Sequence, residues 1–126
     1  QTRPEIYALL LRIYLDRQQW DLAHSCASHL IRVTPQDPNP WVAKAEIVRR
    51  LHGEEASSVV FQEACAHFPE HGEVLYGIAC AAARDGDVTR AKVYLASAIG
   101  YEPGLKARAL DDDALRLVWA DIENMG

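Results

Sequence analysis

The sequence predicts an all-α fold made of repeated helix pairs, and three observations lead to this prediction. Apolar residues recur at helical spacing along most of the 126-residue chain. Prolines stand at positions 35, 69 and 103, so that 69 − 35 and 103 − 69 are both 34. Short polar or glycine-containing breaks divide each stretch between these prolines into two helical segments. A fixed period of this length with two helices per unit is typical of a helical repeat array.

The first repeat is expected to span about residues 4–37. Pro4 suits the first turn of a helix, where its missing N–H costs nothing. The apolar spacing predicts a helix from there to about Asp16, followed by a polar break. A second helix begins at Trp20 and ends just before Pro35, because proline cannot continue a helix.

The second and third repeats are expected at about residues 38–71 and 72–105. In the second, Gly53 separates the two helices, since its backbone tolerates the positive φ of a tight turn. In the third, the turn falls at Gly86, and Asp87 after it is a good N-cap for the following helix. Both repeats end at a proline, as the first does.

The pattern changes after the third repeat. Residues 104–110 are expected to form a linker, and residues 111–124 a last helix with one apolar stripe. A stack of helix pairs leaves its final face bare, and a terminal helix of this kind covers it. We therefore predict a single domain over residues 1–126. The stripe consists of Leu115, Val118, Trp119 and Ile122.

Composition narrows the function classes. The formal net charge of −5 argues against a nucleic-acid binder that works through bulk positive charge. No apolar run approaches the roughly 20 residues that span a bilayer. The three cysteines have no CxxC spacing, which favours a reducing compartment and a cytoplasmic location. The chain begins at Gln1 without Met, so we expect it to be a piece of a longer protein.

The residues that recur in the three predicted repeats resemble a tetratricopeptide repeat, whose 34-residue unit has a loose Trp-Leu-Gly-Tyr-Ala-Phe-Ala-Pro pattern. Lys44 and Ser57 depart from it, which makes the second repeat the least typical. The last part of the chain also resembles the end-of-array form common in bacterial members. The positions on which the pattern falls, Lys44 and Ser57 included, are Tyr7, Leu10, Leu11, Tyr14, Ala23, Ala27, Leu30 and Pro35; Trp41, Lys44, Ala45, Val48, Ser57, Phe61, Ala64 and Pro69; and Leu75, Ile78, Ala79, Ala82, Ala91, Leu95, Ala98 and Pro103.

The resemblance implies a right-handed superhelix whose concave wall, built from the first helix of each repeat, holds a peptide or helix of another protein. The chain would then be an interaction scaffold. The sequence has no phosphate-binding glycine loop, nucleophile elbow or HExxH motif. We therefore expect no enzymatic activity, no cofactor and no metal.

The candidate partner contacts are residues on the concave wall whose side chains are not needed for packing between the helices. Tyr76 would be an aromatic platform, and the arginines would grip an acidic segment through paired hydrogen bonds. The alternative is that the arginines are ordinary solvated surface paired with nearby glutamates. The clamp positions of chaperone-binding members hold Ala8, Arg12, Val42 and Glu46, so that carboxylate clamp is not expected. The candidate set is Arg12, Leu15, Asn39, Glu46, Arg49, Arg50, Tyr76, Cys80 and Arg84, within a wider wall that includes Glu5, Ala8, Val42 and Glu73.

Two other functions stay open at this stage. Ile6, Leu9 and Ile13 on the first helix have no preceding repeat to cover them, so two copies of the chain could pair there as a homodimer. The chain could also be a regulatory appendage of a larger protein, for which the missing Met is the hint. Cys80 has two interpretations as well, a reactive thiol in the groove or a small residue filling a tight space.

Overall fold

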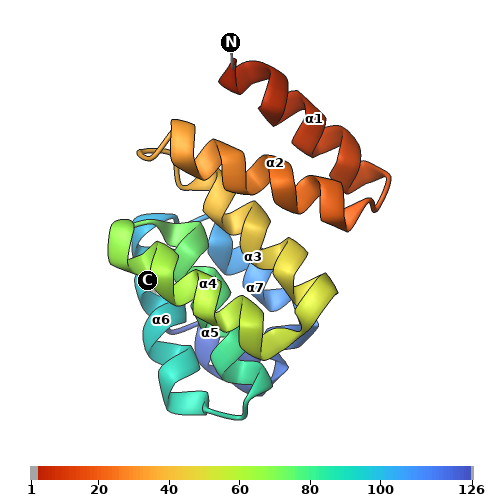
Figure 1. Cartoon of the computed structure of the whole chain (residues 1–126). Helices are drawn as coiled ribbons and strands as arrows, with labels where there is room; N and C mark the ends of the chain where they lie inside the picture. The colour runs from red at the N-terminus through yellow and green to blue at the C-terminus, as the bar shows by residue number, and fades with distance from the viewer. Residues whose placement is uncertain (1–2, 126) are drawn as a thin grey trace. The chain divides into compact units, whose positions relative to one another are not determined.

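The computed structural model describes residues 3–125, and this part of the chain is built from helices joined by short loops (Figure 1). The predicted all-α class is confirmed. Gln1 and Thr2, on which the expectation about the start of the chain rests, lie outside the described residues. Within the described part, no helix is long and apolar enough to cross a bilayer. The elements are α1 (Pro4–Asp16), α2 (Trp20–Val33), α3 (Asn39–His52), α4 (Glu54–His67), α5 (Gly72–Arg84), α6 (Val88–Tyr101), α7 (Leu105–Leu110), a 3-10 segment η1 (Asp113–Val118) and α8 (Trp119–Ile122).

The helix ends are those that the turn residues predict. Helix α1 begins at Pro4, and α2 ends at Val33, ahead of Pro35. Gly53 after α3 and Gly86 after α5 have φ of +96° and +80°, which glycine adopts without the steric cost of a Cβ. The division into three repeats within a single domain stays a prediction, since the contacts group the chain into two compact units, Gln1–Val60 and Phe61–Gly126.

In the first unit, α1 and α2 lie side by side and run in opposite directions (Figure 1). Their facing sides form a core with α3. This core contains the residues that the repeat pattern marks for packing. Its buried members are Leu11, Ala23, Cys26, Ala27, Leu30 and Ile47, with Tyr7, Leu10 and Tyr14 half-buried against them.

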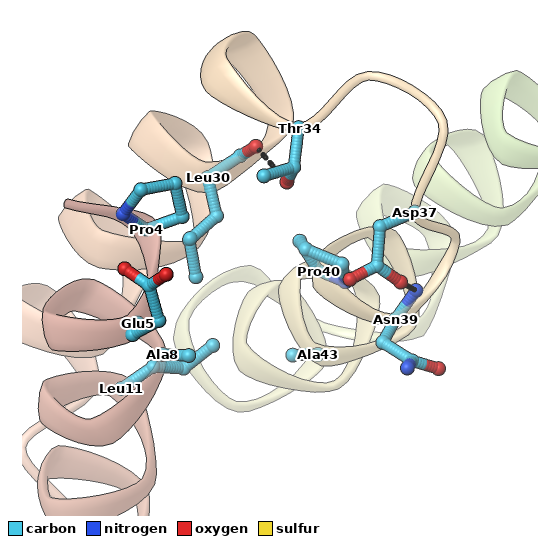
Figure 2. Close-up of a pocket in the computed structure, with 10 residues that line it drawn as sticks. All are labelled: Pro4, Glu5, Ala8, Leu11, Leu30, Thr34, Asp37, Asn39, Pro40 and Ala43. Carbon is cyan, nitrogen blue, oxygen red and sulfur yellow. Dashed lines mark hydrogen bonds between the residues drawn. The ribbon is translucent and has the colours of Figure 1, made fainter.

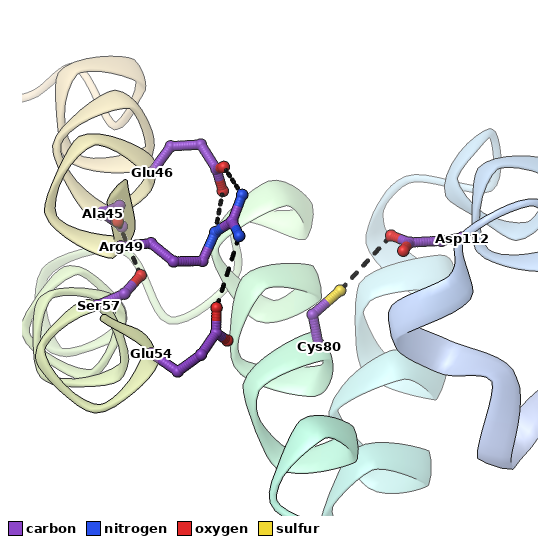
Figure 3. A network of polar contacts seen from close by, with 7 residues as sticks. All are labelled: Ala45, Glu46, Arg49, Glu54, Ser57, Cys80 and Asp112. Carbon is purple, nitrogen blue, oxygen red and sulfur yellow. Dashed lines mark hydrogen bonds and ion pairs between the residues drawn. The ribbon is translucent and has the colours of Figure 1, made fainter. Parts of the chain in front are cut away.

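Ser57, one of the two departures from the repeat pattern, has a defined structural role. Its side chain is 3% exposed, and its hydroxyl donates a hydrogen bond of 2.7 Å to the carbonyl of Ala45 (Figure 3). A buried hydroxyl without a partner would be costly, and this bond removes the cost. The serine therefore occupies a small-residue position and links α4 to α3.

In the second unit, α5 and α6 form an antiparallel pair with a continuous core. Asp87 caps α6, as predicted, by accepting a hydrogen bond of 3.1 Å from the Arg90 N–H. The small and large residues that the repeat pattern assigns to packing are all buried in this pair. They are Leu75, Ile78, Ala79, Ala82, Ala91, Leu95 and Ala98.

The end of the chain differs from the prediction. The segment expected to be a linker contains helix α7, and the helix expected over 111–124 is divided into η1 and the single turn α8. Helix α7 ends at Leu110, and the break before η1 falls at Asp112, whose backbone is extended and whose carboxylate accepts the Ala114 N–H at 3.0 Å. The predicted apolar stripe is nevertheless inside, since Leu115, Val118 and Ile122 are fully buried in the core of the second unit.

Candidate functional site

The candidate site is an open pocket of about 380 Å³ in the first unit (Figure 2). It is bounded by the first turns of α1, the end of α2 and the first turns of α3. Six of its ten lining residues are apolar, so the pocket is suited to holding an apolar group. The lining residues are Pro4, Glu5, Ala8, Leu11, Leu30, Thr34, Asp37, Asn39, Pro40 and Ala43.

Residue size explains why a pocket forms here. Ala8 on α1 and Ala43 on α3 carry only a methyl group, which leaves space between the two helices. Leu11 and Leu30 belong to the buried core beneath, at 8% and 4% exposure, and present apolar surface from below. Pro40, in the first turn of α3, adds a ring without an N–H. The pocket is therefore a gap between α1 and α3, with the buried core of the first unit as its floor.

The polar lining residues differ in which of their hydrogen-bonding groups remain available to a ligand. The Thr34 hydroxyl donates to the Leu30 carbonyl at 2.6 Å, which uses its proton within α2. The Asn39 N–H donates to Oδ1 of Asp37 at 3.0 Å, and this bond fixes the turn into α3 (Figure 2). Glu5 is an exposed carboxylate on the first turn of α1. No lysine or arginine is among the lining residues, so the pocket carries two negative charges.

The predicted partner-binding residues of the first unit separate into distinct groups. Asn39 lines the pocket, together with Glu5 and Ala8 of the wider predicted wall. Arg12 is exposed on α1, and Leu15 is half-buried against the core.

The predicted cations on α3 are engaged within the chain. Arg49 forms hydrogen-bonded ion pairs with Glu46 and a further ion pair with Glu54 at 3.6 Å (Figure 3). The hydrogen bond with Glu46 raises the pKa of Arg49 above its ordinary value. The Arg50 guanidinium lies 5.3 Å from the centre of the Trp20 ring. For Arg49 this arrangement agrees with the alternative in which the arginines pair with neighbouring glutamates, whereas Arg50 contacts an aromatic ring instead.

In the second unit, two predicted contacts are not accessible. Tyr76 and Cys80 were expected on the groove wall, but they are only 3% and 7% exposed. The Tyr76 hydroxyl donates to Oδ2 of Asp112 at 2.7 Å. Figure 3 shows the Cys80 thiol directed at the Asp112 carboxylate, 3.7 Å from the same oxygen. The Arg108 guanidinium covers the Tyr76 ring at 4.6 Å from its centre. The chain's own C-terminal segment therefore contacts and covers these two side chains.

The environment of Cys80 argues against a reactive thiol. Burial, followed by the negative charge of Asp112, raises its pKa to about 12. A thiol with this pKa is almost entirely protonated at neutral pH, and the protonated form is a poor nucleophile. Of the other predicted residues in this unit, Arg84 is exposed at the end of α5.

The sequence did not indicate the contributions of Leu30, Thr34 and Asp37 to the pocket. All three belong to the second helix of the first repeat or to the loop after it, whereas the prediction considered first helices only. The loop carried one usable signal, the run Asp37-Pro38-Asn39-Pro40, in which Asp and Pro are typical of a turn leading into a helix.

Comparisons with known proteins complete the description of the fold. No family model and none of the curated proteins compared matches this sequence. Among solved structures, the chain is similar to the first TPR of Spaghetti (RPAP3) bound to the HSP90 peptide SRMEEVD. The TM-score is 0.70 at 14% identity, over 96% of this chain and 90% of that chain. It is also similar to a structure described as MamA MSR-1 C2, with a TM-score of 0.63 at 19% identity, over 80% of this chain and 58% of that chain.

The fold is that of tetratricopeptide repeats. This result confirms the resemblance inferred from the sequence. The bacterial end-of-array form stays a prediction. At these identities the tetratricopeptide-like fold is common to the three chains, and what this chain binds must be argued from its own pocket.

Proposed function

We propose that this tetratricopeptide-like chain is a protein-interaction module that holds a short segment of a partner protein, with one apolar side chain inserted between α1 and α3. The observation that carries the proposal is the open apolar pocket in the first unit. The peptide-bound tetratricopeptide structure supports it by analogy, because that domain has the same fold and is bound to a peptide.

The chemistry of the pocket favours binding over catalysis. Its lining contains no thiol, imidazole or amine, and the Thr34 hydroxyl proton is directed at a backbone carbonyl. Burying one leucine-sized side chain contributes about 1.5–3 kcal/mol. A single anchor of this size gives weak binding, so the partner segment must make further contacts along the helices.

Filling the pocket should abolish this anchor. We expect Ala8→Trp to weaken the binding of peptides selected on the wild-type chain from a displayed random library by roughly 10- to 100-fold, which corresponds to the loss of one buried side chain. Fluorescence polarisation of labelled synthetic peptides measures the affinity. The matched control is Leu9→Trp, since Leu9 is the next residue on α1, is 60% exposed and lies outside the pocket lining.

Equal affinities for the wild type and Ala8→Trp would overturn the assignment of this pocket, and so would a selection that yields no binding peptide. Circular dichroism of each variant checks that the helices are retained, so that a loss of binding is not a loss of folding.

A second candidate function is self-association through α1. Ile6 and Leu9 are 51% and 60% exposed and stand three residues apart, on one face of the helix. If this face pairs two copies, the wild type will behave as a dimer in size-exclusion chromatography with light scattering, and Ile6→Lys combined with Leu9→Lys will give a monomer. A wild-type chain that is monomeric at every concentration would exclude this function and leave the peptide-binding proposal intact.

A further inference from the structure

We propose that the partner segment is positively charged, with lysine or arginine flanking the apolar side chain that enters the pocket. This inference rests on the proposed function and specifies the chemistry of the partner. It reverses the expectation of an acidic partner, which was drawn from the arginines of the predicted wall. The reason is that the pocket has two carboxylates at its edge and no cation in its lining.

The two carboxylates are placed to act on either side of the anchor. Glu5 lies on α1 and Asp37 on the loop before α3, and Figure 2 shows the apolar side chains between them. Asp37 uses Oδ1 for the Asn39 N–H, which leaves Oδ2 for a partner. Within residues 3–125 neither carboxylate takes part in an ion pair with a side chain of the chain itself. Both carboxylates are therefore open to a cation of the partner as far as the described residues go.

The cations that an acidic partner would require are not available at the pocket. Arg49 is held by two carboxylates, Glu46 and Glu54, and Arg50 lies against the Trp20 ring. Arg12 is exposed on α1, one helical turn beyond Ala8, but is not part of the pocket lining. The peptide in the similar solved structure, SRMEEVD, contains three acidic residues. A peptide of that composition would bring like charges together at Glu5 and Asp37.

The expected effect is moderate and depends on salt. An exposed ion pair changes an affinity by roughly 1.5- to 5-fold, and two pairs acting together by roughly 2- to 25-fold. Charges at this degree of exposure are screened by added salt, because the Debye length falls from about 10 Å at 0.1 M to about 3 Å at 1 M. The preference for positive flanks should therefore be largest at low ionic strength.

The test uses the peptides selected on the wild type, resynthesised with lysine, glutamine or glutamate at the positions flanking the apolar anchor. We expect affinities in the order lysine, glutamine, glutamate at 50 mM salt, with the difference reduced at 500 mM. In the double variant Glu5→Gln with Asp37→Asn, the three peptides should bind within about twofold of one another. Asp37→Asn keeps an oxygen that accepts the Asn39 N–H, so the turn into α3 is retained.

The matched control is Asp16→Asn with Glu55→Gln. It removes the same two charges from exposed positions of the first unit that do not line the pocket, and the order of the peptides should persist in it. An equal or reversed order in the wild type would overturn the inference about charge. If Ala8→Trp still blocks binding in that case, the proposed function stands. If replacing the apolar anchor of a peptide by serine leaves its affinity unchanged, the proposed function itself is overturned.

Discussion

Replacing Gly77 by alanine is expected to destabilise the second unit by about 1–3 kcal/mol, the range for overpacking a core. A Cβ at this position would lie 2.2 Å from Cε1 of the Phe61 ring, and two other ring carbons are within 2.6 Å. Phe61 is 9% exposed, so its ring cannot swing into solvent without losing its own burial. The helix at Gly77 has no positive φ, and the cost therefore comes from contact between α4 and α5. Urea unfolding measures the change.

Gly100→Ala is the control, because it makes the same substitution in a helix of the same unit. Nothing lies within 4 Å of a Cβ built there. Alanine has the higher helix propensity, so this variant should gain up to about 1 kcal/mol. Phe61→Leu should relieve part of the clash, which a double-mutant cycle with Gly77→Ala would detect as coupling. If Gly77→Ala and Gly100→Ala have the same stability, the close approach of Phe61 is not a constraint on the fold.

The sequence was sufficient to predict helices α1 to α6, because their ends depend on local chemistry. Pro35 stops α2, Gly53 and Gly86 adopt positive φ, and Asp87 caps α6, all through interactions within a few residues. The buried faces followed from helical periodicity. Gly77 is different. It must lack a Cβ because the ring of Phe61, sixteen residues earlier in the chain, packs against it in the folded structure.

The candidate site was less predictable because it, too, depends on contacts between residues far apart in the sequence. Helical phase placed Tyr76 and Cys80 on the wall, but no local signal indicates that Asp112, 36 residues after Tyr76, covers both. The pairing of Arg49 with Glu54 across the turn after α3 likewise depends on the tertiary structure. Phase placed Asn39 on the wall, and in the structure Asn39 lines the pocket. It could not show that the space between α1 and α3 remains open.

Asp112→Ala is expected to have the other large effect, a loss of about 2–4 kcal/mol in the free energy of unfolding. The carboxylate accepts hydrogen bonds from the Tyr76 hydroxyl and from the Ala114 N–H. Leaving the buried hydroxyl without a partner costs about 1–3 kcal/mol, and losing a cap about 1 kcal/mol. Asp111→Ala, an exposed neighbour with the same substitution, should change stability by less than about 0.5 kcal/mol.

The Cys80 thiol reports where this loss occurs. In the wild type its pKa of about 12 and its burial should make alkylation by iodoacetamide at pH 8 slow compared with that of Cys65, which is only half-buried. Asp112→Ala removes one cause of the raised pKa and detaches the segment that covers the thiol, so Cys80 should be alkylated faster. Asp112→Asn keeps the cap and a polar group beside Tyr76, and should be intermediate in both stability and alkylation. Mass spectrometry of the alkylated peptides separates the sites. If Asp112→Ala lowers the free energy of unfolding but leaves the rate of Cys80 alkylation under native conditions unchanged, Asp112 stabilises η1 alone. It then does not hold the C-terminal segment over α5.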